Sequence, residues 1–145
     1  MRAILKIIAL FSALLLAGEA RAEGDDVFVP IAKYISRGDA ESLTAWFADN
    51  LEISILSLST DSSRSQASRI LKNFFKSYSP RSFAITHTAT QGNLKYALGT
   101  LNAGGEVFEV TIFMSFSESG YRIQQLKIDR IPCVLARALQ LKKIG

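Results

Sequence analysis

Apolar residues recur at three- and four-residue intervals in two segments near the start of the chain, the spacing of one face of a helix. The first predicted helix runs from Val27 to Gly38, because glycine is common at the residue that follows a helix. The second begins after Asp39, a favoured N-cap residue, and is expected to end near Asn50. The branched, alternating residues 51–58 then predict the first strand.

A serine-rich connection, 57–63, separates this strand from the longest predicted helix. Ser63 and Gln66 fit a capping box, in which each side chain satisfies a free backbone N–H of the other residue at the start of a helix. The apolar stripe that follows reaches Phe75 and stops before Pro80. This segment carries the strongest helix signals in the sequence.

The rest of the chain alternates between apolar and polar residues, as strands with one buried face do. The alternating runs are 82–90, 94–101, 106–117 and 121–131. Glycine-containing pairs separate them, and short glycine turns between alternating runs predict an antiparallel meander. The predicted order is therefore ααβαββββ, an α+β domain of two layers with its helices on one face of a curved sheet.

The last strand interrupts its own alternation. Ile123 and Leu126 share a buried face only if one residue between them is extra, which predicts a bulge at Gln124 or Gln125. Such a bulge either turns one amide toward the interior or is an ordinary irregularity of a strand edge.

The first 22 residues predict a cleavable signal peptide. Arg2 and Lys6 precede an apolar run at 7–17, and Ala20 and Ala22 are the small residues that a signal peptidase reads. An apolar run of this length spans about 16 Å as a helix, which is too short for the ~30 Å of a bilayer. We therefore expect cleavage after Ala22, export to the periplasm or beyond the cell, and no membrane span in the mature chain.

The mature chain is expected to form one domain, 23–131, followed by a tail, 132–145. The tail fits a short amphipathic helix with a basic side, which packs on the domain, frays, or lies on an anionic membrane surface. Cys133 is the only cysteine, so the chain has no internal disulfide, and its thiol is either buried or paired with another chain.

The basic composition does not predict a nucleic-acid partner. The chain has 17 Lys and Arg against 13 Asp and Glu, but six of the basic residues lie in the signal peptide and in 137–145. Residues 23–130 carry 11 basic and 12 acidic side chains. Because a nucleic-acid-binding surface needs a concentrated positive face, we expect none here.

Short motifs spread along the chain carry a family resemblance. They are Ala45-Trp46-Phe47, Gln66-Ala67, Phe74-Phe75, the run 96–101 and the run 123–126. With the order of elements, they resemble the nuclear transport factor 2-like (cystatin-like) superfamily, in which a curved sheet wraps a long helix as a cone. More closely, residues 32–128 are similar to an exported bacterial family known as domain of unknown function 4783. The resemblance implies a fold but no activity.

The resemblance also implies a pocket between the helices and the concave face of the sheet. Alternation places Phe83, Ile85 and His87 on one face of their strand. In the next strand it places Tyr96 toward the pocket, with Leu94 and Leu98, and turns Lys95 and Ala97 away. The predicted lining is Tyr34, Trp46, Phe74, Phe83, His87, Tyr96, Phe108 and Gln125. Apolar walls with a few polar groups are typical of a small-molecule site and equally of a filled core, so both remain open.

His87 is the strongest candidate for chemistry, as a general base with Tyr96 as a hydrogen-bond donor. A catalytic histidine needs a partner, however, and no motif places an acid beside it. The alternative is a histidine that is hydrogen-bonded at the edge of the core. One histidine and one cysteine do not make a tetrahedral metal site, and no glycine-rich phosphate loop precedes a helix, so we expect no metal or cofactor.

Three functions are compatible with the sequence. The first is a non-catalytic binding module for a small apolar ligand or a protein partner. The second is a homodimeric scaffold that pairs through the outer face of the sheet. The third is an enzyme of the isomerase, dehydratase or cyclase type that uses His87. The first ranks ahead because it needs only the apolar lining.

Overall fold

The computed structural model describes residues 27–131, so the predicted signal peptide, the tail and Cys133 lie outside the described residues. Within this range the helices and strands are, in order, α3 (Phe28–Arg37), α4 (Ala40–Thr44), β1 (Phe47–Ile55), β2 (Leu58–Ser63), α5 (Arg64–Ser77), β3 (Pro80–Gln91), β4 (Leu94–Ala103), β5 (Glu106–Ser117) and β6 (Gly120–Arg130). None of these helices is both long and apolar enough to cross a membrane.

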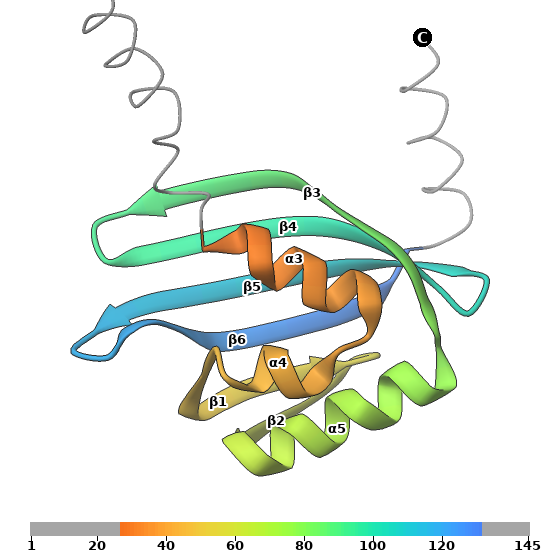
Figure 1. Ribbon diagram of the computed structural model, residues 1–145, viewed down its shortest axis with the longest axis horizontal. Coiled ribbons are helices and arrows are strands. Elements are labelled where there is room, and N and C mark those ends of the chain that lie inside the picture. The colour runs from red at the N-terminus through yellow and green to blue at the C-terminus, as the bar shows by residue number, and fades with distance from the viewer. Residues whose placement is uncertain (1–26, 132–145) are drawn as a thin grey trace, which may run out of the picture.

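The six described strands form one sheet in the order β2-β1-β6-β5-β4-β3. The predicted meander is confirmed, because β3, β4, β5 and β6 each pair antiparallel with the next strand. Strand β1 pairs parallel with β6 and antiparallel with β2, so β2 and β3 are the two edges. Figure 1 shows the helices together on one side of the curved sheet, with α4 and α5 at the β1–β2 end. The α+β class is therefore as predicted.

Two segments differ from the prediction. The second helix ends at Thr44 instead of near Asn50, and the serine-rich connection forms strand β2, so the order is ααββαββββ. Leu56 and Ser57 make the two-residue turn between β1 and β2, both with positive φ (52° and 71°). Hairpin turns of this kind usually contain glycine or asparagine. Because this turn contains neither residue, no hairpin is expected here from the sequence.

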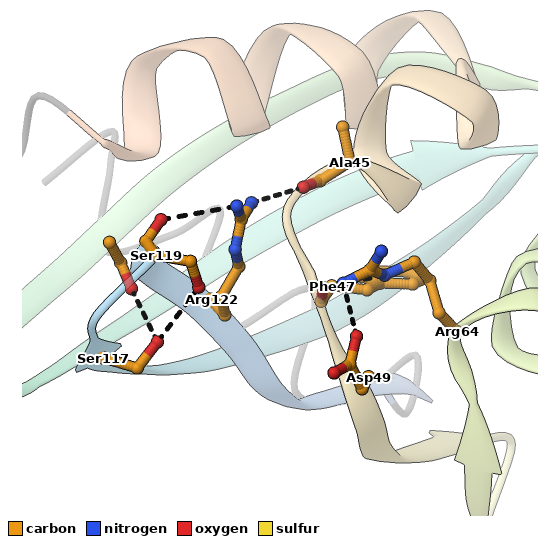
Figure 2. A network of polar contacts seen from close by, with 8 residues as sticks. Ala45, Phe47, Asp49, Arg64, Ser117, Ser119 and Arg122 are labelled. Carbon is orange, nitrogen blue, oxygen red and sulfur yellow. Dashed lines mark hydrogen bonds and ion pairs between the residues drawn. The ribbon is translucent and has the colours of Figure 1, made fainter.

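Two arginines hold the crossing from α4 to β1, where the prediction of a longer helix failed (Figure 2). Arg122 of β6 donates to the carbonyl oxygen of Ala45 at 2.6 Å. Arg64 of α5 donates to the carbonyl oxygen of Phe47 at 3.2 Å and forms an ion pair with Asp49 at 2.9 Å. These charged donors satisfy carbonyls that a longer helix would have bonded internally, so the chain is free to turn into the sheet.

Helix α5 lies where its capping signal predicted. The Ser63 hydroxyl accepts a hydrogen bond from the backbone N–H of Gln66 at 3.3 Å. The stripe formed by Ala67, Leu71 and the two phenylalanines after it is buried against the sheet. The local sequence therefore determines both the start of this helix and the face that it buries.

The hydrophobic core fills the space between the helices and the sheet. An aromatic cluster stands at its α5 end, where the rings of Phe74, Tyr78 and Phe108 have centroids 5.1–5.2 Å apart. Phe108 is fully buried and meets Phe74 edge-on, an arrangement favoured by aromatic quadrupoles. This part of the helix–sheet interface is therefore a packed core.

Candidate functional site

The face of β4 that meets the helices is the opposite of the predicted one. Ala97 and Lys95 are buried on this face, whereas Tyr96 and Leu98 lie on the outer face of the sheet. The inner face of β4 carries small residues because neighbours pack closely on it. A Cβ added at Gly99 would lie 2.4 Å from the ring of Phe83. The expectation that the bulkier residues of this strand point inward is therefore wrong.

His87 also faces outward, contrary to the prediction. Phe83 and Ile85 face the helices, but the register with β4 shifts between Ile85 and His87, so Thr86 is an extra residue. A bulge of one residue reverses the alternation beyond it. His87 consequently pairs with Leu98 on the outer face. The expectation that His87 shares a face with Phe83 and Ile85 is wrong.

The predicted pocket residues divide between the two sides of the sheet. Five of them, Tyr34, Trp46, Phe74, Phe83 and Phe108, belong to the core or pack against it. The other three are His87, Tyr96 and Gln125, and their pairing places them on the outer face. Gln125 there donates to the Glu52 carboxylate at 3.4 Å. The predicted lining is thus divided between the two sides of the sheet and does not surround one cavity.

Among the described residues, Tyr96 is the neighbour of His87 that could take part in a reaction. Its imidazole meets the Tyr96 ring edge-on, with centroids 6.4 Å apart. Among residues 27–131, no hydrogen bond or ion pair joins His87 to an acid. Nor do three or more His, Cys, Asp or Glu side chains gather in a metal-binding set within this range. The described geometry therefore offers an imidazole and a phenol on an open sheet face, without an acid partner.

The bulge predicted at Gln124 or Gln125 is confirmed in β6. The register of β5 and β6 shifts between Phe113 and Met114, which makes Gln124 the extra residue. Gln124 lines a polar hollow of about 450 Å³ beside β1 and β2. Ser62 also lines this hollow, and its hydroxyl is buried without a hydrogen-bond partner among the described residues. A bound water would satisfy such a group.

A second hollow, of about 460 Å³, opens where α3 faces the bulge of β3. Its walls are Phe28, Val29, Ala32, Ile85, Thr86, His87 and Thr88. This is the surface closest to the predicted His87 site. It lies at the edge of the sheet, however, and none of the aromatic residues predicted to line the pocket is among its walls.

A groove between α5 and the β1–β2 hairpin is the most apolar of these surfaces, and we call it the α5–hairpin groove. It measures about 460 Å³. Its lining is Ile53, Ile55, Leu56, Leu58, Thr60, Gln66, Ile70, Asn73, Phe74, Ser77 and Tyr78, with no charged side chain. The groove was not predicted from the sequence because one of its walls is β2, whose serine-rich composition is typical of a loop. The leucine at position 58 within that serine-rich run was the feature of the sequence that could have indicated an apolar surface.

The outer face of the sheet carries a smaller apolar row. Tyr96 pairs directly with Phe113, and Leu98 lies beside them, all partly exposed. Lys127 and Asp129 form an ion pair at 3.5 Å on the β6 side of this row. The row is therefore apolar at its centre and charged at one margin.

Residues 28–129 match the family described as Domain of unknown function (DUF4783). The chain belongs to this family. Among curated proteins, none matches the sequence. The described part of this DUF4783 protein has the fold that the resemblance implied.

Solved structures agree with this membership. A DUF4783 family protein from Bacteroides uniformis is 22% identical with a TM-score of 0.67, over 70% of this chain and 94% of that one. A DUF4783 family protein from Bacteroides ovatus is 22% identical with a TM-score of 0.69, over 71% of this chain and 94% of that one. A putative dehydratase of the NTF2-like family from Streptomyces avermitilis is 13% identical with a TM-score of 0.53, over 69% of this chain and 87% of that one. At these identities the likeness shows an NTF2-like fold alone.

Proposed function

We propose that this DUF4783 protein is a non-catalytic binding module whose site is the α5–hairpin groove. One observation carries the proposal. Leu58 is 80% exposed at the margin of a groove that is mostly apolar and has no charged side chain in its lining. Apolar surfaces of this kind with a few polar groups are typical of ligand-binding and partner-binding sites. The ligand class is therefore an apolar group that would cover Leu58.

The backbone that presents Leu58 supports the proposal. Leu56 adopts a positive φ, which costs a residue with a Cβ roughly 1–2 kcal/mol. The turn is held by the Leu56 N–H, which donates to the carbonyl of Ile128 at 2.9 Å, and by the Ser57 N–H, which donates to Asp129 at 3.1 Å. Strained backbone that the surroundings hold in place occurs often at binding sites.

The alternative positions have less support. The interior behind the groove is packed by Phe74 and Phe108, and His87 has no acid partner among the described residues. An enzymatic role for His87 and Tyr96 therefore lacks the proton-transfer partner that it needs. Binding at the groove needs no proton-transfer partner.

The test uses N-phenyl-1-naphthylamine, an uncharged dye whose fluorescence rises in apolar surroundings. We expect saturable binding by the wild-type protein and a large loss of affinity in Leu58→Ser. Val29→Ser is the matched control, because Val29 is 66% exposed and lies on α3, outside the groove. Equal dye affinity in all three proteins, or no binding by the wild type, would refute the proposal.

A second candidate function is pairing of two copies through the outer sheet face. The row of Tyr96, Leu98 and Phe113 favours it. A two-fold axis through this row, at right angles to the strands, would set the apolar centres of the two copies against each other and the Lys127–Asp129 margin of one copy against that of the other. Sedimentation velocity tests it. A dimer that becomes a monomer in Phe113→Glu but not in Leu58→Glu supports pairing, and a wild-type monomer at micromolar concentration rules it out.

We also propose export, on the signal-peptide pattern of residues 1–22. Expression of the full chain in a bacterial host should yield periplasmic protein with Glu23 at its N-terminus. Cytosolic protein with the intact N-terminus would contradict this proposal.

A further inference from the structure

Helix α5 has a one-sided charge. Between Arg64 and Ser77 it carries four basic side chains and no acidic one. Arg64 is paired with Asp49, but Arg69, Lys72 and Lys76 are exposed and form no ion pair with any other described residue. We call these last three residues the basic stripe.

The basic stripe runs parallel to the α5–hairpin groove. Each of its residues comes immediately before a groove-lining residue of α5, namely Ile70, Asn73 and Ser77. One residue is a constant rotation of about 100° on a helix, so the stripe follows the groove a little more than a quarter turn away, on the exposed side of α5. From Arg69 to Lys76 the stripe extends over about 10 Å of helix axis, at 1.5 Å per residue.

The opposite wall of the groove does not neutralise this charge. Leu58 and Thr60 of β2 line the groove, and Asp61 between Thr60 and Ser62 points to the other face of the strand, where alternation puts it. An occupant would therefore meet apolar surface at the bottom and unneutralised positive charge along one side.

We infer that the α5–hairpin groove binds an amphipathic segment of a partner protein, with apolar side chains in the groove and Asp or Glu side chains along the basic stripe. This inference rests on the proposed function of the groove. Three cations spread over about 10 Å match several carboxylates spaced along a peptide, as on a helix lying in a groove. A fatty acid would place a single carboxylate at one end.

The protein's own tail does not fit this description. Residues 132–145 contain Arg137, Lys142 and Lys143 and no acid. Like charges beside the basic stripe would repel this segment, so the complementary partner is another chain.

The experiment selects binders from a displayed library of random 16-residue peptides on the wild-type protein. We expect the selected peptides to combine apolar residues with Asp and Glu. Their affinity, measured by fluorescence anisotropy, should fall about tenfold or more in Lys72→Glu/Lys76→Glu, and should weaken as salt rises. Lys33→Glu/Arg81→Glu is the matched control, because it changes the net charge equally at exposed positions outside the groove and should bind like the wild type.

The two proposals fail in different ways. Loss of dye binding in Leu58→Ser supports the groove as a binding site. If the selected peptides then show no acidic bias, or bind Lys72→Glu/Lys76→Glu as tightly as the wild type, the acidic partner is refuted while the groove stands. The same holds if no peptide is selected while sodium palmitate displaces the dye, since the anion would then be an aliphatic carboxylate. Dye that fails to bind the wild type refutes the groove itself.

Discussion

Gly99 is the position where the packing of the two layers is most directly testable. Its Cα lies under the ring of Phe83, and a Cβ added there would stand 2.4 and 2.5 Å from two ring atoms and 2.9 Å from the carbonyl oxygen of Ala84. A Cβ does not approach non-bonded atoms this closely in proteins, so Gly99→Ala must displace the ring. Its backbone needs no positive φ, and steric overlap is therefore the only expected penalty.

The magnitude follows from two opposing terms. Overpacking of a well-filled core costs roughly 1–3 kcal/mol. Replacing glycine by alanine returns about 0.4–1 kcal/mol, because the unfolded chain loses conformational freedom. We therefore expect Gly99→Ala to lower the free energy of unfolding by about 1–2 kcal/mol, with a fall in Tm of about 4–8 °C for each kcal/mol.

Urea denaturation of four proteins forms the assay: wild type, Gly99→Ala, Phe83→Ala and the double variant. If the Phe83 ring causes the penalty, Gly99→Ala should cost at least about 1 kcal/mol less in the Phe83→Ala background, an interaction energy that double-mutant cycles resolve. Equal costs in the two backgrounds would refute this account of the packing.

Three further predictions concern local conformation. Ser63→Ala removes the N-cap acceptor for the Gln66 N–H and should cost about 1 kcal/mol in chemical denaturation. Ser57→Gly should raise the free energy of unfolding by up to about 1 kcal/mol, since glycine adopts φ 71° without strain; an unchanged or lower value contradicts this. The hydroxyl and then the backbone N–H of Ser42 lower the pKa of Asp39 below its ordinary 3.8, so its stabilising effect is complete above that pH and is lost as the pH falls through the folded-state value. Asp39→Asn should therefore flatten the acid limb of Tm against pH, and an unaltered limb would contradict the assignment.

Local patterns in the sequence determined several elements without help from the fold. The capping residues at Ser63 and the apolar stripe after it set the start and buried face of α5. The glycine pairs at 92–93 and 104–105 set two turns of the meander. The bulge at Gln124 followed from one break in alternation. Each of these signals acts between residues fewer than about five positions apart, and such interactions can be recognised in a sequence.

The tertiary structure alone decided which face of β4, and of β3 beyond its bulge, is buried and where the candidate site lies. Alternation has period two, so one extra residue at Thr86 moved His87 from the predicted pocket to the outer face. Likewise, Ala97 and Gly99 face the core because the Phe83 ring packs over that side of β4, a contact that their small side chains do not announce. The α5–hairpin groove exists only because β2 pairs with β1 across a turn without glycine. These features depend on contacts between distant segments, whose energies are not encoded in the pattern of either segment alone.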